Sequence, residues 1–154
     1  MKTFNTLVSE YSQQITEIMP WDLEEKLASD KPPLLLDIRE PYEFDSMRIK
    51  DSINVPRGIL ETACEYDFEE TVPELVEARD KEIVVICRSG NRSVFAAHVM
   101  QLMGYTQVSS LKTGLRGWND YEQPLINAAG KVDIDDAEEY FTPKLRPEQL
   151  QPTK

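Results

Sequence analysis

Cysteine and histidine are scarce in this chain of 154 residues, which has two cysteines and one histidine. The two cysteines, Cys64 and Cys87, are too few for a disulfide framework. One histidine and no close pair of cysteines provide no ligand set for a metal, so we expect neither a metal site nor a bound cofactor. Folding must then rely on apolar packing, for which a hydrophobic content of 40% is sufficient.

Positive charge and long hydrophobic runs are also lacking. The chain has 17 Lys and Arg against 28 Asp and Glu, which gives a formal net charge of -11. Nucleic acids and anionic membrane surfaces attract basic proteins, so we expect neither as a partner. No run has the apolar length that crosses a bilayer, and residues 1–6 lack the apolar segment of a secretory signal. We therefore expect a cytoplasmic protein whose thiols stay reduced.

The most informative stretch is residues 83–104. The apolar, mostly β-branched residues 83–86 predict a strand buried on both faces, and residues 93–104 predict a helix that ends at Gly104. The loop between them begins with Cys87, and its backbone N–H groups and the helix dipole favour an anion. Arg88 and Arg92 add two positive charges. These surroundings stabilise a thiolate, so Cys87 is the candidate nucleophile.

Elsewhere, predicted strands alternate with predicted helices. Residues 16–19, 34–38, 53–55 and 107–111 are typical of strands, whereas residues 20–28, 57–64, 72–78 and 115–121 are typical of helices. This alternation predicts an α/β fold with a parallel sheet and right-handed crossovers.

The two ends of the chain have patterns of their own. Phe4, Leu7 and Tyr11 have helical spacing and predict a short helix, which packs on its own domain or forms a dimer contact. The prolines at 143, 147 and 152 exclude a long helix near the C-terminus. Tyr140 and Phe141 are expected either to pack on the domain or to dock a partner.

Four segments, in order along the chain, resemble the rhodanese domains, sulfurtransferases that carry sulfane sulfur as a cysteine persulfide. They are residues 34–39 with 43–44, residues 53–56, residues 87–93 with 96–97, and residues 111–114 with Trp118. The resemblance covers about residues 17–125 and leaves an N-terminal extension, 1–16, and an acidic, proline-containing C-terminal extension, 126–154. It implies a rhodanese-like α/β fold: a five-stranded, mostly parallel sheet flanked by helices on both faces.

The resemblance also implies roles for the loop. Cys87 would be the catalytic residue, and substrate would be bound by Arg88, Ser89, Gly90, Asn91, Arg92 and Ser93. Backbone donors would stabilise the persulfide, and Arg92 would bind the anionic end of a donor. Because the matching aspartate of the family supports the loop arginine, Asp37 is expected to pair with Arg88.

The implied reaction moves sulfane sulfur from thiosulfate or a persulfide donor to a thiol or protein acceptor, or to cyanide. A non-catalytic sulfur-carrier or binding module is an alternative, although the presence of Cys87, Arg88 and Arg92 argues against it. Tyrosine phosphatases and arsenate reductases are a second alternative, but phosphatases have one residue more than the four that separate Cys87 from Arg92. A shorter loop leaves less room for a phosphoryl group. Both a monomer and a homodimer remain open.

Overall fold

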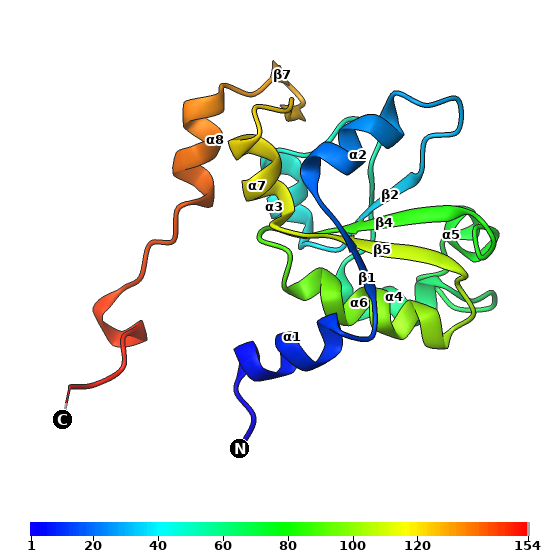
Figure 1. The fold of residues 1–154 in the computed structure, drawn as a ribbon, viewed down its shortest axis with the longest axis horizontal. Coiled ribbons are helices and arrows are strands. Elements are labelled where there is room, and N and C mark those ends of the chain that lie inside the picture. The colour runs from blue at the N-terminus through cyan, green and yellow to red at the C-terminus, as the bar shows by residue number, and fades with distance from the viewer. Residues whose placement is uncertain (154) are drawn as a thin grey trace.

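The computed structural model describes residues 1–153, and its centre is a sheet of five strands (Figure 1). The strands are β1 (Thr16–Ile18), β2 (Leu34–Asp37), β3 (Ile53–Asn54), β4 (Glu82–Ile86) and β5 (Gln107–Leu111). Their order is β1-β5-β4-β2-β3, and every neighbouring pair is parallel. The predicted α/β fold with a five-stranded sheet is confirmed. Because the strands are parallel, the loops that follow them meet at one edge of the sheet.

Helices cover both faces of the sheet (Figure 1). One face is covered by α4 (Leu60–Ala63), α5 (Pro73–Val76) and α6 (Arg92–Leu102), which share one hydrophobic cluster with the strands. The other face is covered by α2 (Pro20–Leu27), α7 (Gly114–Asp120) and α8 (Ile134–Phe141), which share a second cluster. The short helices α3 (Pro41–Ser46) and η1 (Arg57–Ile59) lie in the connections after β2 and β3.

Strand β4 separates these two clusters. The side chains of Ile83 and Val85 belong to the cluster beneath α6, whereas Val84 and Ile86 belong to the cluster beneath α7. All four are fully buried, as the apolar run predicts. Since β4 lies between β5 and β2, Cys87 follows the middle strand of the sheet.

The N-terminal helix α1 (Phe4–Ser12) packs against α6, and so against its own domain. The ring of Phe95 lies 6.0 Å from that of Phe4 and 5.4 Å from that of Tyr11, measured between centroids. Tyr11 also contacts the ring of His98, whose Nε2 lies 3.1 Å from Oε1 of Gln14. The one histidine of the chain therefore serves the contact between α1 and α6.

The C-terminal extension contains structure that the sequence did not predict. A hairpin of β6 (Ile126–Asn127) and β7 (Gly130–Lys131) leads to α8, which lies beside α7. Asp133 caps α8 by accepting hydrogen bonds from the backbone N–H groups of residues 135 and 136. Phe141, 1% exposed, anchors the helix in the second cluster. After it the chain runs outward, with one short turn, η2 (Pro147–Gln149) (Figure 1).

Among residues 1–153, no helix combines the length and apolar character that a membrane crossing requires.

Replacing Phe141 by alanine should lower the free energy of unfolding by about 3 kcal/mol, because the substitution empties a fully packed site. Urea denaturation of the whole chain measures this change. The control is Leu145→Ala in the exposed tail, which should change stability by less than about 0.5 kcal/mol. Equal stability of the two variants would show that α8 is not anchored by Phe141.

Candidate active site

The thiol of Cys87 lies in a cradle formed by its own loop. Its Sγ accepts hydrogen bonds from the backbone N–H of Gly90, at 3.1 Å, and of Ser93, at 3.4 Å. It also lies 3.3 Å from the hydroxyl oxygen of Ser93. Cys87 is 1% exposed, so these donors replace the water that a charged sulfur would otherwise bind. Of the residues predicted to supply backbone donors, 88–93, two donate directly to the sulfur.

Gly90 is required by the shape of this cradle. Its φ of +86° lies in the left-handed region, which residues with a Cβ rarely adopt. A Cβ at this position would also lie 2.7 Å from the backbone nitrogen of Thr113. The loop is thus fixed by close contact with the turn that follows β5.

Ser110 is a member of the site that sequence reasoning missed. Its hydroxyl lies 2.7 Å from the hydroxyl of Ser93, and both side chains are fully buried. Ser110 holds the Ser93 hydroxyl beside the sulfur. Nothing in the sequence of β5 indicates that the Ser110 hydroxyl would contact Ser93.

Arg92 is paired with Glu43, a second residue that sequence reasoning did not assign to the site. The guanidinium donates to both carboxylate oxygens, at 3.0 and 2.9 Å, and the Glu43 side chain is 8% exposed. Burial alone would raise the pKa of Glu43. Hydrogen bonds from Arg92 and from the backbone N–H of Glu40 outweigh burial, so the pKa lies below its usual value. The same pairing raises the pKa of Arg92, and the nearby Cys87 and Asp37 charges add to this effect.

The expected pair between Asp37 and Arg88 is wrong, because Asp37 binds Arg39. The Arg39 guanidinium donates to both Asp37 oxygens, with Nε–Oδ1 at 2.9 Å and Nη2–Oδ2 at 2.8 Å. It also donates to the carbonyl oxygens of Glu43 and Met47. Residues two apart in extended chain point the same way, so Arg39 reaches Asp37 within a buried pocket. The pair holds α3, which carries Glu43, against the end of β2.

Arg88 instead contacts the C-terminal extension. Its Nη2 donates to the backbone carbonyl of Tyr140, in α8, at 3.3 Å. The two residues are 52 positions apart in the chain, and neither motif nor spacing predicts the contact. The residue that follows Cys87 is thereby linked to a helix that lies outside the resemblance to the rhodanese pattern.

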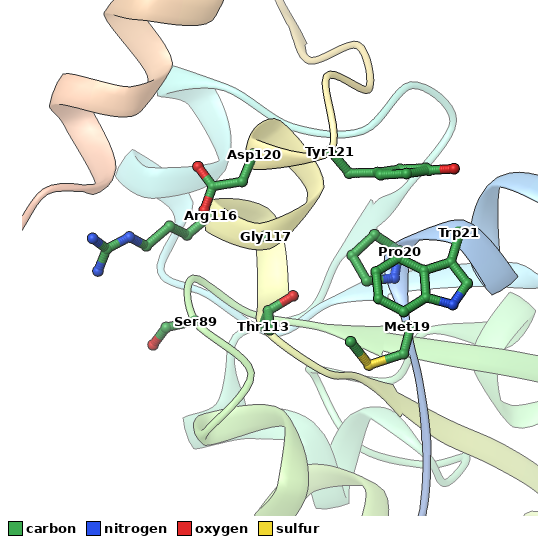
Figure 2. Close-up of a pocket in the computed structure, with 9 residues that line it drawn as sticks. All are labelled: Met19, Pro20, Trp21, Ser89, Thr113, Arg116, Gly117, Asp120 and Tyr121. Carbon is green, nitrogen blue, oxygen red and sulfur yellow. The ribbon is translucent and has the colours of Figure 1, made fainter.

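The other loop residues have different surroundings. Asn91 precedes α6, and its carbonyl accepts from the backbone N–H of Val94. Ser89 is exposed and lines a cavity of about 480 Å³ beside the loop (Figure 2).

The second cysteine, Cys64, is fully buried at the end of α4. Burial raises the pKa of its thiol, which disfavours the thiolate that nucleophilic attack requires. Among residues 1–153, no group of three His, Cys, Asp or Glu side chains is arranged to hold a metal ion.

Replacing Glu43 by glutamine should make the free energy of unfolding depend less on pH in the acidic range. The folded-state pKa of Glu43 lies below its usual value of 4.5, so its ionised form stabilises the fold above that pH. This contribution is lost as the pH falls through the lowered pKa. Urea denaturation between about pH 3 and 7 should show a smaller acid-induced loss in Glu43→Gln than in wild type. Glu61→Gln, which removes an exposed ion pair with Arg57, is the control and should follow wild type. Parallel pH profiles of wild type and Glu43→Gln would contradict the lowered pKa.

Comparison with known proteins places this geometry in a family. The model of the rhodanese-like domain matches residues 20–121. A mitochondrial protein of Schizosaccharomyces pombe, whose name proposes a thiosulfate sulfurtransferase, is 31% identical over 103 residues, 65% of this chain and 72% of its own. A sulfurtransferase of Allochromatium vinosum is 28% identical over 116 residues, 75% of this chain and 99% of its own.

Among solved structures, a protein of unknown function from Rhodopseudomonas palustris, RPA3614, shares 29% identity with a TM-score of 0.70. The alignment covers 80% of this chain and 94% of that protein, whose description suggests a tyrosine phosphatase. The rhodanese-like model spans both the cysteine loop and the turn after β5 that it contacts. We conclude that this chain belongs to the rhodanese-like domain family of sulfurtransferases and sulfur carriers.

Proposed function

We propose that this protein transfers sulfane sulfur through a persulfide on Cys87. The donor is thiosulfate or a persulfide, and the acceptor is a thiol. The observation that carries the proposal is the convergence of the Gly90 and Ser93 N–H groups on Sγ. The two cysteines are free, so the chemistry suits a reducing compartment such as the cytoplasm.

In the first half-reaction, the Cys87 thiolate attacks the outer sulfur of thiosulfate. A sulfur–sulfur bond forms on Cys87, the sulfur–sulfur bond of thiosulfate breaks, and sulfite leaves with the electron pair. In the second, an acceptor thiolate attacks the outer sulfur of the persulfide, and Cys87 departs as a thiolate. Both steps are displacements at sulfur, so no separate oxidant or reductant is needed.

The cradle stabilises negative charge on the nucleophile before and after each step. The N–H groups of Gly90 and Ser93 are fixed by the fold, so they need no rearrangement as charge develops. A hydroxyl can turn to suit its partner, so Ser93 can donate to the ionised sulfur while Ser110 donates to Ser93. The first turn of α6 adds the positive end of its dipole.

Arg92 can still bind an anionic sulfur donor although its guanidinium is paired with Glu43. A guanidinium has five N–H donors, and two of those of Arg92 face Glu43. The side chain is 37% exposed, so the remaining donors are open to solvent and to a sulfonate-like group. Arg92 therefore binds the anionic end of the donor while Glu43 fixes its position.

Cys87→Ser should abolish persulfide formation, because a serine hydroxyl cannot hold sulfane sulfur as a persulfide. Mass spectrometry after incubation with thiosulfate should show one added sulfur atom on wild type and none on Cys87→Ser. Cys64→Ser is the matched control and should still gain one sulfur atom, on Cys87. The Cys64 thiol is buried and has a raised pKa, so its removal should not affect loading. A modified Cys64 beside an unmodified Cys87 would overturn the proposal.

Arg92→Ala should raise the thiosulfate concentration that gives half-maximal loading of Cys87 by about tenfold, the cost of one charge-assisted hydrogen bond. The persulfide of 2-mercaptoethanol is the second donor: Cys87 attacks its outer sulfur, and 2-mercaptoethanol leaves as a thiolate. Because this donor has no sulfonate-like group, the concentration that it requires should rise much less. Arg57→Ala, an exposed arginine paired with Glu61, is the control. Equal losses with both donors would assign Arg92 to support of the loop alone.

The description of RPA3614 favours a second candidate, hydrolysis of aryl phosphates. In this chain two backbone N–H groups donate to the sulfur within a loop of four intervening residues, which suits a persulfide better than a phosphoryl group. Release of phosphate from an aryl phosphate, without sulfur loading, would favour the phosphatase. Loading without transfer to any thiol would favour a carrier.

A further inference from the structure

Residues 142–153, which we call the arm, follow α8 and leave the body of the domain. Every residue of the arm is exposed, and the hydrogen bonds and ion pairs that it makes within residues 1–153 join it to itself or to α8. Two of the exposed side chains are leucines, Leu145 at 64% and Leu150 at 56%. Each leucine would gain from burial, which the described part of its own chain does not supply.

The backbone of the arm is ordered locally although it is exposed. Prolines at positions 143, 147 and 152 fix the backbone φ at three of its residues. The backbone N–H of Arg146 donates to Oε1 of Gln149 at 2.8 Å, and the carbonyl of Arg146 accepts from the N–H of Gln149 at 2.9 Å. A segment that is already restricted loses less conformational entropy when it binds, so the arm is suited to docking.

An apolar cavity of about 540 Å³, which we call the β2 cavity, lies at the edge of the sheet opposite Cys87. Leu34 begins β2 and Ile49 precedes β3, so both lie at the amino ends of parallel strands, whereas Cys87 follows the carboxyl end of β4. Ten of the fourteen residues that line the cavity are apolar, and Leu27 of α2 is one of them. The volume and the lining suit apolar side chains.

The arm of the same chain points away from the β2 cavity. Pro32 and Pro33, in the loop between α2 and β2, form part of the cavity lining. Figure 1 shows the arm, in orange to red, running outward from α8 on the side of the molecule opposite that loop. The arm of a second copy can reach the cavity without any rearrangement of either fold.

The arm is basic, whereas the whole chain is acidic. Lys144 and Arg146 flank Leu145, and Glu148 is the acidic residue of the arm, on a chain with a net charge of -11. The nearest ion pairs of the two cations are with exposed carboxylates, Glu139 for Lys144 and Glu148 for Arg146. Exposed ion pairs of this kind contribute little to stability, so both cations can exchange them for others.

The rim of the β2 cavity carries charges that complement the arm. Glu24 and Asp51 lie there, both exposed, and neither makes an ion pair within residues 1–153. Lys50 is also at the rim, so the two carboxylates leave it with a net negative charge. A leucine flanked by two cations therefore matches an apolar cavity bordered by two carboxylates.

We propose that this protein forms a symmetric homodimer in which the arm of each copy docks in the β2 cavity of the other. Leu145 enters the apolar cavity, and the two cations beside it face Glu24 and Asp51 at the rim. Because the exchange is symmetric, every contact is made twice in the dimer. The contact lies at the edge of the sheet opposite Cys87, so dimer formation does not depend on sulfur transfer.

Sedimentation equilibrium of the full chain over a range of protein concentrations measures the dissociation constant of the dimer. Wild type should dimerise at micromolar concentrations. Leu145→Ala should raise the dissociation constant about a hundredfold, or about tenfold for each of the two cavities, because each loses the burial of a leucine side chain. Leu102→Ala is the matched control: this leucine ends α6, is 74% exposed and lies outside both the arm and the cavity, so its removal should leave the dissociation constant unchanged.

Exchange of charges tests where the arm docks. The pair of changes Lys144→Glu and Arg146→Glu should raise the dissociation constant about tenfold, and so should the pair Glu24→Lys and Asp51→Asn. Asparagine is chosen at position 51 because the φ of +67° there is one that asparagine tolerates. The chain with all four changes should recover most of the wild-type affinity, since opposite charges face each other again.

A wild type that stays monomeric at millimolar concentration would overturn the exchange of arms, and so would an unchanged dissociation constant in Leu145→Ala. A dimer that the four charge changes together fail to restore would overturn the assignment of the β2 cavity. Loading of Cys87 with sulfur should be the same in wild type and all these variants, so failure of the sulfur chemistry is a separate result. Association stabilises the fold only where the dimer is populated, so urea denaturation of Leu145→Ala well below the dissociation constant should match wild type.

Discussion

A negatively charged sulfur can be buried only where hydrogen-bond donors replace its water, and this requirement explains much of the architecture. The donors at Cys87 come from a loop that must turn back on itself, which Gly90 permits with its positive φ. The turned loop contacts the backbone of Thr113 so closely that no side chain fits between them. Gly114 makes the reciprocal contact, since a Cβ there would lie 2.6 Å from the carbonyls of Cys87 and Arg88. The cradle is therefore a property of two loops together.

At this edge of the sheet, some arginine side chains are paired with carboxylates and others are not. Arg39 is neutralised by Asp37 in full burial, and Arg92 by Glu43 at partial exposure. Arg88 donates to a backbone carbonyl, which carries no net charge. Arg116 also makes no ion pair within residues 1–153, so two arginines near Cys87, Arg88 and Arg116, have no carboxylate partner there although the chain is acidic. Arginines without a carboxylate partner attract anions despite the overall charge of the chain.

The sequence predicts those features that depend on neighbours along the chain. The apolar run of β4, the loop after it and the helix that follows are local patterns, and the structure contains all three; α6 ends at Leu102, two residues before Gly104, which has a φ of +94°. Contacts between side chains from different segments could not be predicted in the same way. Asp37 was expected to pair with Arg88, and a motif could not tell that Arg39, two residues further along the chain, would be buried beside it. The contact between Ser93 and Ser110 depends on the register of β5 beside β4, which no local pattern encodes.

The C-terminal extension illustrates why the limits of a domain pattern need not be the limits of a site. Helix α8 lies beyond the matched residues, yet Phe141 fills the same cluster as Trp118 of α7. That packing holds the carbonyl of Tyr140 within 3.3 Å of Arg88, so the position of a loop cation depends on apolar burial far along the chain. Ordering the long, half-buried side chain of Arg88 costs rotamer entropy, which this contact offsets. The extension thus acts on the candidate site through the fold, because it restricts the side chain of Arg88, the residue next to Cys87.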